Sequence, residues 1–238
     1  MVAVATTGRV KAQTRTPKDV IDRIVRAYPS STAIKNGKLQ VQGKPVDTGT
    51  GLSEGTFDGR MAKANLIDQL SIEYPRGCPL AQPAEGEDPG RLRSDAFFRS
   101  MYGGSPVAVK KNLVSVDWFG SPMQVTSING VDEELKQVAA ELNDRPELQK
   151  YLERPGGSFT WRPIAGTKVQ SAHSFGIAVD INTKFSDYWR WKDTTKVGPY
   201  VNRIPCEIAE VFENHGFIWG AKWWHFDTMH FEYRPELL

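Results

Sequence analysis

Ten residues in the C-terminal half, SAHSFGIAVD (Ser171–Asp180), decide how the rest of this 238-residue sequence is interpreted. Within them, His173 precedes a strand-like run of small and apolar residues, and Asp180 interrupts that run. An aspartate is poorly suited to a buried strand unless it is paired or binds a metal. A second stretch, WWHFDTMHFE (223–232), places Asp227 three residues before another histidine, His230. The two stretches therefore supply two imidazoles and two carboxylates.

Two histidines and one carboxylate are the ligand set of a catalytic zinc site, whose fourth position stays open for water. His173, Asp180 and His230 can supply this set. Asp227 then remains as a carboxylate that takes a proton from the zinc-bound water and passes it to the leaving amine. Two alternatives stay open: Asp180 could cap or form a salt bridge, and Asp227 could be a ligand or a hydrogen-bonding support.

The pattern Ser-x-His-x-x-Gly-x-Ala-x-Asp, followed by Asp-x-x-His-Phe-Glu, resembles the zinc D-alanyl-D-alanine carboxypeptidase family of peptidoglycan peptidases. That family includes VanY-type carboxypeptidases, VanX-type dipeptidases and the L-alanyl-D-glutamate endopeptidases of phage endolysins. The resemblance covers about residues 129–235. It implies a Zn²⁺ cofactor on His173, Asp180 and His230, with Asp227 as general base. An aspartate at the base position is typical of the endolysin-like branch.

The resemblance also implies substrate-binding residues. Arg162, in FTWRP (159–163), would contact the substrate and stabilise the oxyanion, and Ser171 would line the pocket. Trp224 and His225 are further candidates for substrate binding. Structural alternatives exist for three of these residues. Arg162 could stack or pair on the surface, Trp224 could belong to the core or the cleft wall, and His225 could be packed or could support a ligand.

The sequence predicts an α+β protein, with a tail and a mainly helical extension over residues 1–90 and a catalytic domain over residues 91–238. The boundary falls in residues 74–90, which hold four prolines and three glycines. The family resemblance implies a small antiparallel sheet with flanking helices, as in hedgehog-like and DD-peptidase-like domains. Apolar periodicity predicts helices at 16–28, 60–70, 91–102, 132–143 and 205–215, strands at 113–119, 123–128, 159–163, 175–182 and 230–233, and a hairpin at 39–46.

The composition narrows the possible functions. Lys and Arg number 30 against 28 Asp and Glu, and this near-balance argues against a nucleic-acid binder. No apolar run reaches the roughly 18 residues of a membrane span. The first 15 residues, expected to form a tail, lack the apolar core of a secretion signal. Cys78 and Cys206 exclude a disulfide-rich scaffold and leave open whether the two form one disulfide.

Three functional questions stay open at this stage. A peptidoglycan substrate implies that the protein acts in the periplasm or cell wall. The protein would reach that compartment through a signal outside this sequence or, for a phage endolysin, after membrane lysis. The bond cut could be D-Ala-D-Ala or L-Ala-D-Glu, because the loop at 184–203 carries no readable signature. The alternative to an enzyme is a non-catalytic peptidoglycan-binding module with a structural zinc.

Overall fold

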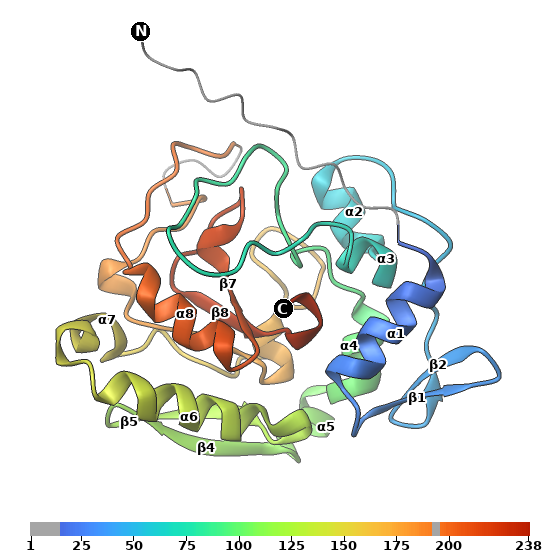
Figure 1. Cartoon of the computed structure of the whole chain (residues 1–238), viewed down its shortest axis with the longest axis horizontal. Coiled ribbons are helices and arrows are strands. Elements are labelled where there is room, and N and C mark those ends of the chain that lie inside the picture. The colour runs from blue at the N-terminus through green and yellow to red at the C-terminus, as the bar shows by residue number, and fades with distance from the viewer. Residues whose placement is uncertain (1–14, 192–195) are drawn as a thin grey trace, which may run out of the picture.

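Three small antiparallel sheets and the helices around them make up the computed structural model, which describes residues 15–191 and 196–238 (Figure 1). The predicted α+β class is confirmed. Of the predicted tail, residues 1–14 lie outside the described ranges. One continuous cluster of buried apolar side chains extends from Val20 to Leu237. No helix among the described residues has both the length and the apolar character that crossing a membrane requires.

The sheet that organises the site has the order β6-β8-β7, with β8 in the centre. Its strands are β6 (Ala178–Asp180), β7 (Phe217–Trp219) and β8 (His230–Tyr233). In the antiparallel register, Asp180 lies directly opposite His230. The register therefore brings two predicted ligands together from positions 50 residues apart. The sequence did not predict β7, because its three residues are all buried and show no alternation.

A second group of elements packs on this sheet. It consists of the hairpin β4 (Leu113–Trp118) and β5 (Ser121–Thr126), together with helices α6 (Val131–Asn143), α7 (Gln149–Leu152) and α8 (Cys206–Asn214). Figure 1 shows α6 running along the hairpin, with α8 above it. The turn predicted at residues 120–122 is wrong. Phe119 and Gly120 form it, both with positive φ (49° and 79°), because a two-residue turn of this kind matches the twist of the strands.

The N-terminal half contributes short elements. They are α1 (Pro17–Ala27), β1 (Thr32–Lys35), β2 (Lys38–Val41), β3 (Lys44–Pro45), α2 (Phe57–Lys63), α3 (Leu66–Gln69), α4 (Asp95–Tyr102) and α5 (Pro106–Lys110). The single helix predicted at 60–70 is wrong, because the Asn65 side chain accepts hydrogen bonds from the backbone N–H groups of Ile67 and Asp68 and starts a new helix there. The helix predicted from residue 91 begins only after its N-cap, Ser94.

The two predicted domains are in extensive contact, and the boundary near residue 90 stays a prediction. Glu236, near the C-terminus, accepts hydrogen bonds from the Tyr28 hydroxyl (2.5 Å) and from the Gln69 amide (2.8 Å). The open question about the cysteines is answered, since Cys78 and Cys206 form a disulfide. The disulfide ties the 74–90 loop to the start of α8.

Replacing both cysteines with serine is expected to lower the free energy of unfolding by about 2–5 kcal/mol, because the disulfide restricts a long loop of the unfolded chain. The two cysteines are 128 residues apart. Urea denaturation of the C78S/C206S protein would measure the change. Ala81→Ser, an exposed substitution in the same loop, is the control. Identical unfolding midpoints for the double variant and the wild type would contradict this expectation.

Candidate metal centre

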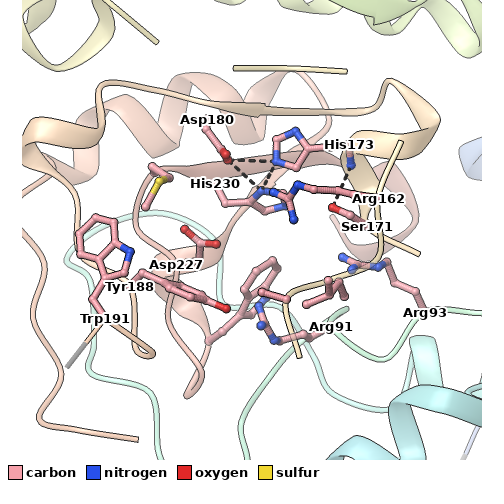
Figure 2. Close-up of a pocket in the computed structure, with 14 residues that line it drawn as sticks. Arg91, Arg93, Arg162, Ser171, His173, Asp180, Tyr188, Trp191, Asp227 and His230 are labelled. Atoms are coloured by element: carbon pink, nitrogen blue, oxygen red, sulfur yellow. Dashed lines mark hydrogen bonds and ion pairs between the residues drawn. The ribbon is translucent and has the colours of Figure 1, made fainter. Parts of the chain in front are cut away.

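Three donor atoms from distant parts of the chain converge on one point. His173 Nε2 lies 3.2 Å from Asp180 Oδ1 and 3.1 Å from His230 Nδ1, and that Nδ1 lies 3.1 Å from the same Asp180 oxygen. Figure 2 shows the triad along one wall of a pocket. Tetrahedral zinc ligands lie about 3.3 Å apart, close to the sides of this triangle. The three side chains that the sequence predicts as ligands are therefore brought together.

His173 is positioned by local structure around the first motif. It lies in the 3-10 turn η3 (Ala172–Phe175), whose N-cap Ser171 accepts a hydrogen bond from the His173 backbone N–H. Gly176 ends this turn with φ 69°, and a Cβ there would lie 2.6 Å from Leu113 Cδ2, so only glycine fits. The His173 Nδ1–H donates to the Ser158 carbonyl at 2.6 Å, which directs the Nε2 lone pair to the triad.

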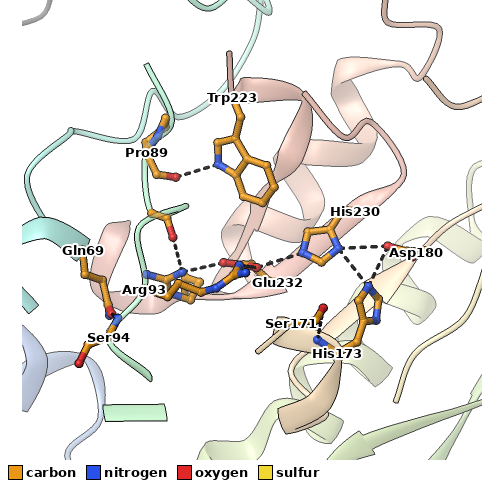
Figure 3. Close-up of polar contacts among 12 residues, drawn as sticks. Gln69, Pro89, Arg93, Ser94, Ser171, His173, Asp180, Trp223, His230 and Glu232 are labelled. Carbon is orange, nitrogen blue, oxygen red and sulfur yellow. Dashed lines mark hydrogen bonds and ion pairs between the residues drawn. The ribbon is translucent and has the colours of Figure 1, made fainter. Parts of the chain in front are cut away.

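His230 is oriented by Glu232, two residues along the same strand and hence on the same face. Its Nε2–H donates to Glu232 Oε2 at 3.0 Å, which leaves Nδ1 as an acceptor (Figure 3). Both imidazoles thus present unprotonated nitrogens to a carboxylate oxygen, and three acceptors at this spacing need a cation between them. Burial opposes the charged form of His230, but without a metal its hydrogen bonds with Asp180 and Glu232 raise its pKa to about 9, so a metal ion that binds here must displace a proton from Nδ1.

Glu232 is itself held between two arginines. Arg93 donates to Glu232 Oε2 and Arg234 donates to Oε1, both at 2.6 Å, and all three side chains are buried. Burial by itself would raise the pKa of Glu232, but the charges of Arg93 and Arg234 and the hydrogen bond from His230 hold it well below its usual range. Arg234 also pairs with Glu236 at 2.6 Å. The orientation of His230 therefore depends on Arg93, which lies far before the first motif, as well as on Arg234 near the C-terminus.

Asp227 lies in the same pocket without taking part in the triad. Its Oδ1 is shielded from solvent and has no hydrogen-bond partner among the described residues. Burial, followed by the nearby Asp180 carboxylate, raises the pKa of Asp227 to about 6. A partly buried carboxylate with an unpaired oxygen beside a metal site is suited to accept and release a proton.

The other predicted site residues lie in two different places. Arg162 and Ser171 line the triad pocket, as do Tyr188 and Trp191 from the predicted loop. Trp224 and His225 line a second pocket, beside Phe57 and Trp189. His225 stacks on Phe57 with ring centroids 4.1 Å apart, and its Nδ1 lies 2.7 Å from Asp88 Oδ2. The structure therefore does not bring Trp224 and His225 to the triad.

The predicted strand at 159–163, which carries Arg162, is wrong. Within the described part of the chain, its only pairing of strand type is an isolated bridge between Pro163 and Gln170. Pro163 lacks a backbone N–H, and the neighbouring Arg162 N–H donates to the Ser174 hydroxyl at 3.0 Å instead of to a strand. An irregular segment therefore carries Arg162 to the pocket.

Three residues of the site were not predicted from the sequence. Glu232 could have been found, because alternate residues of a strand share a face and a ligating histidine needs a partner for its second nitrogen. Arg91 and Arg93 also line the pocket. They lie about 80 residues before the first motif, and no spacing in the sequence connects them to it.

Replacing His173 or His230 with alanine is expected to abolish zinc binding, because two remaining donors cannot hold the ion tightly. Metal analysis of the purified, dialysed variants would show this. His225→Ala is the matched control, since His225 also bonds to a carboxylate but lies in the other pocket. Full zinc retention in the His173 and His230 variants, or equal loss in the control, would refute the proposed ligand set.

Replacing Glu232 with glutamine is expected to weaken zinc binding by about 10- to 100-fold, as is typical when a partner of a ligating histidine is lost. Competition with a chromophoric chelator would measure the affinity. Glu134→Gln is a suitable control because Glu134 bonds His215 Nδ1 at 2.9 Å, away from the triad pocket. An unchanged affinity in Glu232→Gln would show that Glu232 does not support His230.

Comparisons with known proteins agree with this geometry. Residues 165–233 match a family model described as D-alanyl-D-alanine carboxypeptidase. No curated protein and no solved structure matches the chain. The matched segment contains His173, Asp180, Asp227 and His230, whereas Arg162 lies just before it. The family resemblance predicted from the two motifs is therefore confirmed over the segment that carries the candidate metal centre.

Proposed function

We propose that this protein is a zinc-dependent peptidase that hydrolyses an amide bond in the peptidoglycan stem peptide. One observation carries the proposal: three converging metal donors lie beside the unpaired Asp227 oxygen, in a segment that matches a peptidase family. A purely structural zinc site is normally closed by four protein ligands. Here, three side chains offer donors among the described residues, which suits an ion that keeps a position for water.

The residues of the pocket have distinct tasks in this proposal. Bound zinc would supply a Lewis acid that polarises the scissile carbonyl and acidifies a water molecule. The Asp227 carboxylate, which lines the pocket, takes the proton from the attacking water and delivers it to the departing amine nitrogen. Its raised pKa suits both steps, since the same carboxyl must gain and lose a proton near neutral pH.

Arg162 is suited to stabilise the oxyanion. Its side chain is exposed at the pocket and makes one long hydrogen bond, 3.5 Å to the Pro163 carbonyl, among the described residues. The guanidinium is therefore available to donate to the substrate carbonyl oxygen as negative charge develops. Ser171 lines the pocket and also caps the turn that carries His173.

From the proposed substrate we infer that this activity takes place in the periplasm or the cell wall. A carboxypeptidase would release a single alanine from muropeptides, whereas an L-alanyl-D-glutamate endopeptidase would release a longer peptide. Mass spectrometry of a muropeptide digest by the zinc-loaded protein distinguishes the two products. The family description favours the first reaction, and the aspartate at the base position is shared with the second branch.

Replacing Asp227 with alanine is expected to leave zinc bound and to reduce kcat by about 10²- to 10⁴-fold, the usual contribution of a general base. Metal analysis and a muropeptide hydrolysis assay on the same preparation would test both parts. Asp227→Asn keeps the shape of the side chain and should be equally inactive.

Asp227→Ala also separates the enzyme from its alternative. A non-catalytic wall-binding module would show no hydrolysis in the wild type and would bind muropeptides equally well with and without Asp227. Substantial turnover in a zinc-loaded Asp227→Ala variant would instead leave the peptidase proposal standing and reject Asp227 as its base.

A further inference from the structure

Arg91 is a buried cation with no hydrogen-bond or salt-bridge partner for its side chain among the described residues. Its side chain is 6% exposed, and its Nε has no hydrogen-bond partner in the described part of the chain. It forms no salt bridge with any described carboxylate, and its guanidinium carbon lies 4.8 Å from the ring centroid of Trp223. A buried charge without a partner destabilises the folded protein, and such a charge at a pocket is therefore a candidate for ligand binding.

The backbone around Arg91 is fixed by four consecutive contacts with the C-terminal region. The Glu87 carbonyl accepts a hydrogen bond from the Trp224 backbone N–H, and Asp88 bonds His225. The Pro89 carbonyl accepts from the Trp223 indole N–H at 2.8 Å. The Gly90 carbonyl accepts from the Arg234 guanidinium at 2.8 Å. Figure 3 shows the contact between Pro89 and Trp223. Gly90 has φ 76°, and a Cβ there would lie 2.2 Å from Leu237 Cδ1. This segment therefore holds Arg91 in a defined position.

The side chain of Arg91 faces the triad pocket, in which Figure 2 shows it across from the candidate metal ligands. The neighbouring Arg93 is occupied by Glu232. Arg162 is exposed and differs from Arg91 in having no buried, fixed position. Arg91 is thus a largely buried guanidinium in a defined position at the pocket, and such a group is well suited to bidentate binding of a carboxylate.

We propose that Arg91 binds a free carboxylate of the substrate, on a residue adjacent to the scissile amide. This inference rests on the proposed function and adds a specificity determinant outside the segment that matches the family. Two carboxylates of the stem peptide have this chemistry. One is the C-terminal carboxylate of the last D-alanine, and the other is the α-carboxylate that a γ-linked D-glutamate leaves free.

The test compares three synthetic stem pentapeptides with the zinc-loaded protein: the free acid, its C-terminal amide and its D-glutamate α-amide. In the wild type, amidation of the recognised carboxylate is expected to reduce kcat/KM by about 10- to 100-fold, in line with the loss of a hydrogen bond to a charged group. Amidation of the other carboxylate should have little effect. The sensitive peptide identifies which carboxylate Arg91 binds.

Arg91→Gln should lower kcat/KM for the free acid by a similar factor. The variant should also no longer distinguish the free acid from the amide. Arg91→Lys keeps the charge without the fork geometry and should retain part of the discrimination. Arg145→Gln, which removes a surface ion pair with Glu141, is the matched control and should behave as the wild type. Zinc content and melting temperature of each variant verify that the site and the fold are intact.

Calorimetric binding of the same peptides to the zinc-loaded Asp227→Asn protein, with and without Arg91→Gln, tests the inference even if no peptide is hydrolysed. Equal affinity for the acid and both amides would overturn the role of Arg91, and so would discrimination that persists in Arg91→Gln. If the wild type cleaves none of the peptides but discrimination through Arg91 is seen in binding, the proposed hydrolysis fails and carboxylate recognition stands.

Discussion

The candidate metal site depends on keeping one imidazole lone pair of His173 and one of His230 directed at the same point. An imidazole can rotate and can exchange its proton between two nitrogens, so each ring needs a second hydrogen bond to fix it. For His173 this partner is a carbonyl 15 residues away in sequence. For His230 it is a buried carboxylate, Glu232, which must itself be neutralised. Much of the architecture around the site follows from that second requirement.

The neutralisation extends through alternating charges. Arg93 and Arg234 flank Glu232, Arg234 continues to Glu236, and Glu236 accepts from Tyr28 and Gln69. Removing one member of such a network leaves a buried charge without its partner, which typically costs about 3–5 kcal/mol. Residues far before the motifs therefore take part in orienting a metal ligand. The N-terminal region that carries Tyr28, Gln69 and Arg93 has no chemical motif of its own, and this network is the physical reason for its close packing on the site.

The parts of the fold that follow from local sequence were predicted, and the parts that depend on distant partners were not. The ligands were found because histidine and aspartate are conspicuous in a run of small residues, and strand β8 was predicted with its observed limits. The break between α2 and α3 depends on a side-chain cap, and the 159–163 segment fails as a strand because of Pro163 and the turn beside it. The partners of Glu232 and the placement of Arg91 are long-range contacts that periodicity cannot show.

The charges of the pocket explain what kind of substrate it suits. Asp180 and Asp227 contribute negative charge at the metal position, and a divalent cation there would offset both. The positive charge of Arg93 is offset by Glu232. Arg91 and Arg162 then remain in the same pocket as cations without a salt bridge to a described carboxylate. Such a pocket favours a ligand that brings its own negative charge, which agrees with the carboxylate-bearing stem peptide that we propose as the substrate.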